Sequence, residues 1–186
     1  VTPETVVRVG ATNIQASFGD GENELLSISD GYGALFITGQ GMAGEIGGSV
    51  ATHIPDVSLS GTLRLQVNTM NDPEGFNQVM MVGGMPIALD LPAGPYIRIE
   101  GTQVNLSVLG QTLSGDFAFE QATENAQTIV RLSANNVAIH LGGSSPIVSV
   151  SNGSGLFVIS SLGLSGAMRA DIAVNLTDIE LSGSIE

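Results

Sequence analysis

The sequence lacks cysteine, lysine and tryptophan, and each absence excludes a class of protein or site. Without cysteine, neither a disulfide framework nor a thiolate metal site can form. The only cations besides histidine are five arginines against 18 acidic residues, which gives a net charge of −13. Such a charge disfavours binding to nucleic acid or to an anionic lipid surface. Aromatic residues make up 4% of the chain, so its core must be mostly aliphatic.

The sequence also lacks an apolar run near 18 residues, so we expect no membrane span. It shows no signal peptide, and we expect any targeting signal to lie elsewhere in a longer parent protein. Hydrophobic residues make up 42% and charged residues 12%, which excludes a disordered chain. Acidity without lysine or cysteine suits a protein that is secreted or lies on the cell surface.

What the sequence does contain is an internal repeat. The stretch 7–19 returns as 130–142 at an offset of 123 residues, and 27–31 returns as 149–153 at an offset of 122. We therefore predict a first repeat module at 1–125 and a partial second module at 126–186. Tandem modules of this length are typical of arrays that supply length, stiffness or multivalency.

Residues alternate between apolar and polar along most of the chain, which is the pattern of half-buried strands. The clearest case is 57–67, where Val57, Leu59, Leu63, Leu65 and Val67 share one face. Gly83-Gly84 predicts a two-residue hairpin loop between two short strands. The expected strands of the first module are 6–18, 25–37, 42–54, 57–67, 76–82, 85–91, 96–109 and 112–121.

These strands predict an all-β fold, and we expect a long antiparallel meander or rolled sheet of tandem repeats. The triplet Leu-Ser-Gly recurs at 59–61, 113–115, 164–166 and 181–183, with spacings that are multiples of 17 or 18 residues. That spacing also fits the alternative, a β-solenoid with rungs of 17–18 residues. The unbroken alternation of 57–67 and the short loops favour the meander, because parallel pairing needs longer connections.

Two acidic loops are candidate calcium sites, since carboxylate and amide oxygens are the ligands that calcium prefers. The first contains Asp20, Glu22 and Glu24. The second contains Asn71, Asp72 and Glu74, with Asn68 close by in the sequence. The alternative for both is a solvated turn, for which Asp-Gly and Asp-Pro sequences are sufficient. Calcium is the one cofactor that the sequence suggests.

No catalytic constellation is present in the sequence, and we expect no enzyme. His53 and His140 have no second ligand at metal-binding spacing. Arg8, Arg98 and Arg131 recur at one position of the repeat unit. They either pair across strands with an acid such as Glu100 or Glu120, or fix the contact between modules.

The stretches Leu91-Pro92-Ala93-Gly94-Pro95-Tyr96-Ile97-Arg98-Ile99-Glu100-Gly101 and Leu113-Ser114-Gly115-Asp116-Phe117-Ala118-Phe119-Glu120-Gln121 resemble long tandem-repeat modules of giant bacterial secreted or surface proteins of the adhesin type. The resemblance implies an extracellular array and names no ligand.

Three functional hypotheses follow. The first is a structural segment of an extracellular β-rich repeat array, such as a fibre, filament, stalk or adhesin, whose partners are neighbouring repeats or identical chains. The second is a lipid-binding groove of a rolled sheet. The third is a calcium-dependent adhesive module that binds a ligand through its acidic loops.

Overall fold

The computed structural model describes residues 5–72, 74–143, 145–176 and 179–186, and these residues form strands and turns without a helix. The strands are β1 (Val7–Gly19), β2 (Glu24–Thr38), β3 (Gly41–Thr52), β4 (Val57–Asn68), β5 (Phe76–Val82), β6 (Met85–Leu91), β7 (Tyr96–Val108), β8 (Gln111–Glu124), β9 (Gln127–Leu141), β10 (Val148–Ser160), β11 (Gly163–Leu176) and β12 (Ile179–Ile185).

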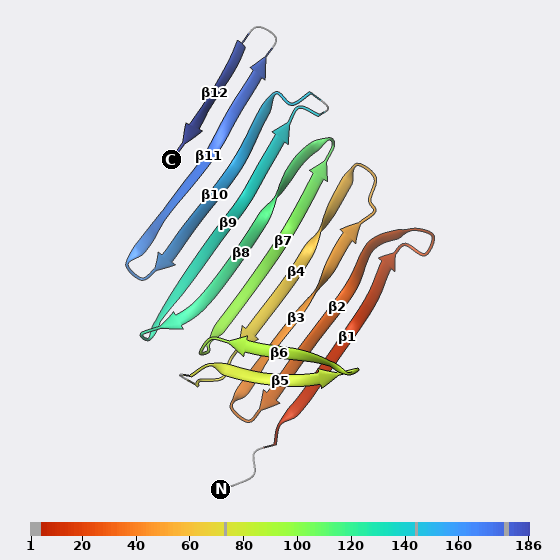
Figure 1. The fold of residues 1–186 in the computed structure, drawn as a ribbon, viewed down its shortest axis with the longest axis vertical. Helices are drawn as coiled ribbons and strands as arrows, with labels where there is room; N and C mark the ends of the chain where they lie inside the picture. The colour runs from red at the N-terminus through yellow and green to blue at the C-terminus, as the bar shows by residue number, and fades with distance from the viewer. Residues whose placement is uncertain (1–4, 73, 144, 177–178) are drawn as a thin grey trace.

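Ten of the strands form one sheet in the order β1-β2-β3-β4-β7-β8-β9-β10-β11-β12, and every neighbouring pair is antiparallel. Figure 1 shows this sheet as an open meander with β1 and β12 at opposite edges. The all-β meander is therefore confirmed. The solenoid alternative is wrong, because its rungs would need parallel pairing. The 17–18-residue spacing reflects one long strand plus its turn.

Strands β5 and β6 leave the main sheet, which differs from the expected row of eight strands in each module. They form a separate two-stranded hairpin, and β4 pairs directly with β7. Gly83 and Gly84 both have positive φ, as the predicted two-residue turn requires. The two strands have seven residues each, whereas β4 has 12 and β7 has 13, so the hairpin is too short to match its neighbours.

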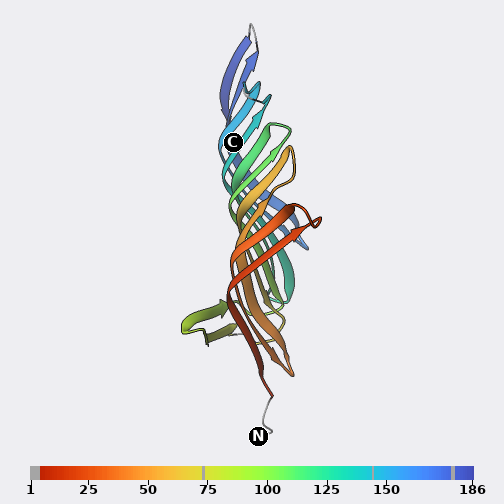
Figure 2. The ribbon, with the colours of Figure 1, turned by 90° about the vertical axis from the view of Figure 1, so that its right-hand side faces the viewer.

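The hairpin crosses one face of the sheet near its β1–β4 end (Figure 2). Its inner side packs on Ala34 and Phe36 through the fully buried Leu89 and its neighbour Ile87. The ring of Phe36 meets that of Phe76 edge to face, with centroids 5.1 Å apart. This corner is the part of the sheet where the structure has two layers.

The two faces of the sheet differ sharply in composition. Directly opposed residues on neighbouring strands share a face. One such row crosses the sheet on the face that carries the hairpin, and we call this face the polar face: Glu45, Gln66, Arg98, Glu120 and Arg131. A parallel row defines the opposite, apolar face: Ile46, Leu65, Ile99, Phe119, Leu132 and Phe157.

A line of irregularities, which we call the bulge row, crosses the middle of the sheet. Seven of the nine neighbouring pairs in the main sheet shift register there. Five side-chain-bearing residues at this line have φ between 52° and 55°: Asn13, Asp30, Gln103, Asn136 and Asn152. Bulges increase local twist, and the sheet is visibly twisted in Figure 2.

The bulge row keeps the apolar side chains on one face. In β9 the apolar positions are Val130 and Leu132 before the bulge at Asn136 and Val137 and Ile139 after it, so the two-residue alternation slips by one residue. Without the extra residue, the second half of the strand would turn its apolar side chains to the polar face. Beyond the row, the apolar face continues as Leu59, Leu106, Leu113, Ile139, Val150 and Ile172.

Strands β9–β12 repeat the pairings of β1–β4 residue by residue. Val7 lies opposite Ile37, and Val130, 123 residues later, lies opposite Ile159. The pairings of β2 with β3 and of β10 with β11 also correspond throughout, including the position of their register shift. The ladder between β8 and β9 joins the two sets and runs from the Thr112–His140 pair to the Glu124–Gln127 pair.

Candidate functional site

The first candidate calcium loop is a hydrogen-bonded turn between β1 and β2. The carboxylate of Asp20 accepts backbone N–H bonds from Asn23 at 2.8 Å and Glu22 at 3.0 Å, and these bonds lower its pKa. The carboxylate of Glu24 accepts a hydrogen bond from Ser17, which lowers its pKa, and lies 3.5 Å from Nδ1 of His53. Asp20 and Glu24 therefore hold the turn together, as a plain Asx turn requires.

The second candidate loop lies between β4 and β5. Asp72 accepts the N–H of Glu74 at 3.0 Å, and Asn71 is exposed. Asn68 does not belong to this cluster, because its side chain is fully buried. It donates to the carbonyl of Pro92 at 2.7 Å and accepts the N–H of Met70 at 3.0 Å, so it fastens the two chain segments that lead into and out of the hairpin.

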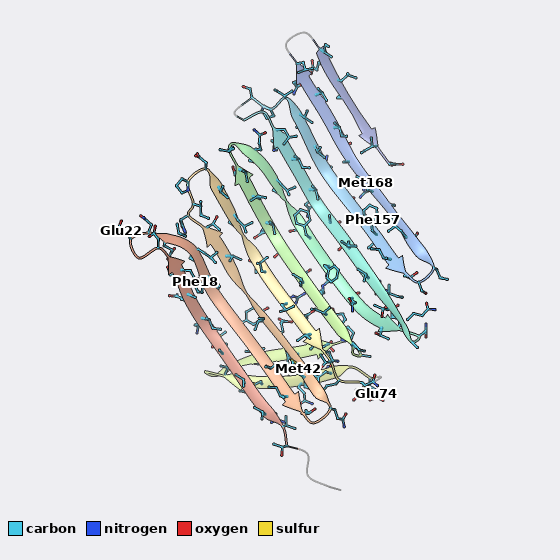
Figure 3. The ribbon with its side chains drawn as sticks, turned by 180° about the vertical axis from the view of Figure 1, so that it is seen from behind. Phe18, Glu22, Met42, Glu74, Phe157 and Met168 are labelled. Carbon is cyan, nitrogen blue, oxygen red and sulfur yellow. The ribbon has the colours of Figure 1, made fainter. Side chains whose placement is uncertain are left out.

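The two loops are not brought together. Figure 3 places Glu22 and Glu74 at opposite ends of the strands. Within the described ranges, no group of three or more histidine, aspartate or glutamate side chains gathers around a point that could hold a metal. Binding of calcium by Asp20, Glu22 and Glu24 or by Asn71, Asp72 and Glu74 stays a prediction. The second histidine, His140, lies 3.2 Å from the hydroxyl of Thr112.

The polar face carries a connected row of ion pairs that runs across five strands of the sheet. Arg98 bonds to Glu100 at 3.1 Å and to Glu120 at 3.0 Å, and the second oxygen of Glu120 accepts from Arg131 at 3.0 Å. The row extends at one end through Arg64 to Glu45 and at the other end to Glu124. The predicted cross-strand pairing of Arg98 and Arg131 is confirmed, whereas Arg8 lies 5.5 Å over the ring of Phe36 instead.

The hydrogen bonds around Glu45 are partly buried, because the hairpin approaches the polar network there. Tyr32 donates to Glu45 at 2.7 Å, and burial together with this carboxylate raises the pKa of Tyr32 to about 12. Gln66 donates to the other oxygen of Glu45 at 2.6 Å. Burial raises the pKa of Glu100, but hydrogen bonds from Arg64 and Arg98 outweigh that effect and keep the pKa below its ordinary value. Each half-exposed pair of this kind stabilises a sheet by about 0.2–1 kcal/mol.

The most distinctive surface is the apolar face, which no element of the described chain covers. Ile46 is 56%, Ile99 48% and Leu132 39% exposed, and the other three members of its defining row are half-buried. Figure 3 looks onto this face, with Phe157 and Met168 on adjacent strands. A hollow of about 470 Å³ lies at its centre, over Gly101. Its rim is formed by large side chains that include Leu63, Phe117, Phe119, Leu132 and Phe157.

A second hollow shows that the face is continuous across the bulge row. Ile28 and Val50, from one side of the row, line it together with Ile46 and Leu65 from the other. Between the strand ends of the described chain, charged side chains of the main sheet lie on the polar face or at the bulge row, and none lies on the apolar face. The apolar face therefore combines a large area with an absence of charge.

Sequence reasoning identified the alternation but missed the bulge row. The sequence signal for the bulge row is a three-residue step between apolar positions, as from Ala134 to Val137, with two asparagines between them. Asparagine and aspartate tolerate the left-handed conformation better than most residues do. Asp116 was also missed. It accepts the N–H of Gln103 at 2.8 Å and the amide of Asn136 at 2.8 Å, and so connects the bulges of β7 and β9.

Comparison with known proteins gives no relative, since no protein-family model, no curated protein sequence and no solved structure matches the chain. The described part of the chain contains no helix with the length and apolar character that a membrane span requires.

Proposed function

We propose that the chain is a structural segment of an extracellular β-rich repeat array, in which successive modules extend one sheet. The observation that carries the proposal is the agreement of strand pairings between β1–β4 and β9–β12. The same registers and the same bulges recur after 122–123 residues. Both copies of the repeat pair their strands in the same way within one sheet. A further copy could therefore join the sheet with the same strand pairings.

The pairing of β8 with β9, which joins the two sets of strands, supports in particular the continuation of one sheet from module to module. Strands β8 and β9 pair over most of their length, with one register shift at Gly115. The ion pairs of Arg131 with Glu120 and Glu124 cross this join. In an array, Arg8 of a following module would take the position of Arg131, because the two residues correspond in the repeat. The join would then add both backbone hydrogen bonds and ion pairs for each module.

The edges of the sheet support the same role. Strands β1 and β12 each have one paired neighbour, so their outer N–H and C=O groups have no strand partner in the described chain. Such edges favour pairing with another strand. The resemblance to giant adhesin-like proteins, the acidity and the absence of cysteine support an extracellular location for the array in this proposal.

The proposal is tested with a polypeptide that carries residues 7–129 three times in direct succession. Elongated particles in electron micrographs are expected, since each copy would continue the sheet of the previous one. The matched control replaces Val9 of the second and third copies with proline, which removes a backbone donor inside the joining strand at an exposed position away from the hairpin. Compact particles from the unmodified polypeptide would contradict the proposal, and loss of elongation in the control alone would support it.

The lipid-binding hypothesis is a second candidate because an uncovered apolar face of this extent could also take acyl chains. It requires that lipid accompany the protein through purification. Mass spectrometry of an organic-solvent extract tests it. A lipid at about one or more molecules per chain would favour this hypothesis over a purely structural role.

A further inference from the structure

The exposed surface of the chain is far larger than its mass requires. A compact monomer of 19.0 kDa exposes about 8,400 Å². This chain exposes 11843 Å². The excess of about 3,400 Å² arises because most of the sheet is a single layer, whereas stable domains pack two layers around a core. A standard interface between two proteins buries about 800 Å² on each partner, so the excess is more than enough for one.

We propose that a second copy of this chain covers the apolar face, with the apolar faces of the two sheets packed against each other. A partner sheet must match the face in extent and must itself carry no charge at the contact. A second copy satisfies both conditions, because its own apolar face has the same dimensions and the same lack of charged side chains. Sheets that pack face to face lie about 10 Å apart with their side chains interdigitated.

The relief of the apolar face suits such interdigitation. Glycines leave low points beside large side chains, as where Gly101 lies opposite both Leu63 and Phe117. The central hollow of about 470 Å³ over this glycine can receive large side chains from the facing sheet. A C2 arrangement brings the same surface of each copy together, so that ridges of one sheet meet hollows of the other.

The charges of the chain lie where this arrangement leaves them in water. The row of ion pairs from Glu45 to Glu124 is on the polar face, which the second copy does not touch. The hairpin also stands on the polar face and does not obstruct the approach (Figures 2 and 3). The inference does not rest on the proposed array, because faces can pair whether or not further modules extend the edges.

The absence of cysteine allows a direct test with single thiols introduced into the full chain. Leu132→Cys places a thiol at the middle of the apolar face. The matched control, Asn135→Cys, places one on the polar face of the same strand. The rate of reaction with a small thiol reagent is measured from dilute to concentrated protein, with sedimentation velocity on the same samples.

We expect a species of twice the chain mass and at least tenfold slower labelling of Leu132→Cys in concentrated protein, with unchanged labelling of Asn135→Cys. Leu132→Glu should weaken association at least a hundredfold while the circular dichroism spectrum keeps its β-sheet form, and Asn135→Glu should not weaken it. If Leu132→Glu fails to fold, the thiol measurement on Leu132→Cys still decides.

Three results would overturn the inference. A monomer whose thiol at 132 reacts freely at all concentrations would mean that the face stays uncovered. A monomer whose thiol is protected at all concentrations would mean that the chain covers its own face. Protection that appears only with phosphatidylcholine vesicles would identify acyl chains as the occupant.

Discussion

Asn68 shows how single side chains hold this structure where the chain departs from a simple meander. Its side chain is fully buried and joins the Met70 N–H to the Pro92 carbonyl, one on each side of the β5–β6 hairpin. Met70 and Pro92 themselves lie outside the strands. An amide side chain supplies both a donor and an acceptor at this point, as no aliphatic residue could.

Asn68→Ala should therefore lower the free energy of unfolding by roughly 1–3 kcal/mol, because it leaves the buried Met70 N–H without its acceptor and removes the bond to the Pro92 carbonyl. Urea denaturation measures the change. Asn105→Ala, at an exposed position of β7, is the matched control and should change stability by less than about 0.5 kcal/mol. Equal effects of the two substitutions would show that the bonds of Asn68 do not stabilise the fold.

Asp116 makes the stability of the fold depend on pH. Its carboxylate accepts the Gln103 N–H and the Asn136 amide, and these bonds lower its pKa below the ordinary value of 3.8. A carboxyl whose pKa is lower in the folded state stabilises the fold above its unfolded pKa, and this contribution disappears as the pH falls through the folded pKa.

We therefore expect the wild type to be more stable than Asp116→Asn at pH 7, and the difference to shrink below about pH 3.8. Denaturation curves of both proteins at several pH values between 7 and 2.5 measure this difference. Asp90→Asn, on the hairpin, serves as the control variant. A difference between wild type and Asp116→Asn that stays constant over this range would rule out the bulge-linking role of the carboxylate.

At the scale of the strand, the bulge row lets a long alternating sequence present one apolar face along its whole length. Gln103 occupies a left-handed position in β7 with φ at 52°, a conformation that costs most residues about 1–3 kcal/mol. Residue types that stabilise a regular strand should therefore destabilise the fold at position 103, and glycine should be favourable there.

Substitution of Gln103 tests this reversal. Gln103→Gly should leave the free energy of unfolding unchanged or raise it by up to about 1 kcal/mol, and Gln103→Val should lower it by about 2 kcal/mol. At Gln121 in β8, where the backbone is regular, the order should be reversed, with valine more favourable than glycine. The same order at both positions would contradict a left-handed bulge at Gln103.

The strands themselves could be predicted from sequence because alternation and turn residues are local signals. The two strands at 76–82 and 85–91 were predicted with their bounds and their Gly83-Gly84 turn. Their place outside the sheet was not, because alternation does not reveal which surface an apolar side will meet. That outcome depends on their short length and on contacts such as Leu89 with Phe36, which are distant in sequence. The candidate calcium loops were located, but their carboxylates make bonds that only coordinates reveal.

At the scale of the whole molecule, the chain is an amphipathic sheet one layer thick over most of its area. Its polar face is stabilised by cross-strand ion pairs. Within the described residues its apolar face is uncovered, and the outer sides of β1 and β12 have no strand partner. Edge pairing would extend the sheet, and face pairing would bury its apolar side. These two contacts use different surfaces, so a fibre could use both at once.

The most direct test of the account is the length of polypeptides that carry residues 7–129 two, three and four times, measured by small-angle X-ray scattering. Each copy adds six strands to the main sheet, and strands lie about 4.8 Å apart, so the longest dimension should grow by about 29 Å per copy. A longest dimension that grows only with the cube root of the mass, as in compact particles, would contradict the account.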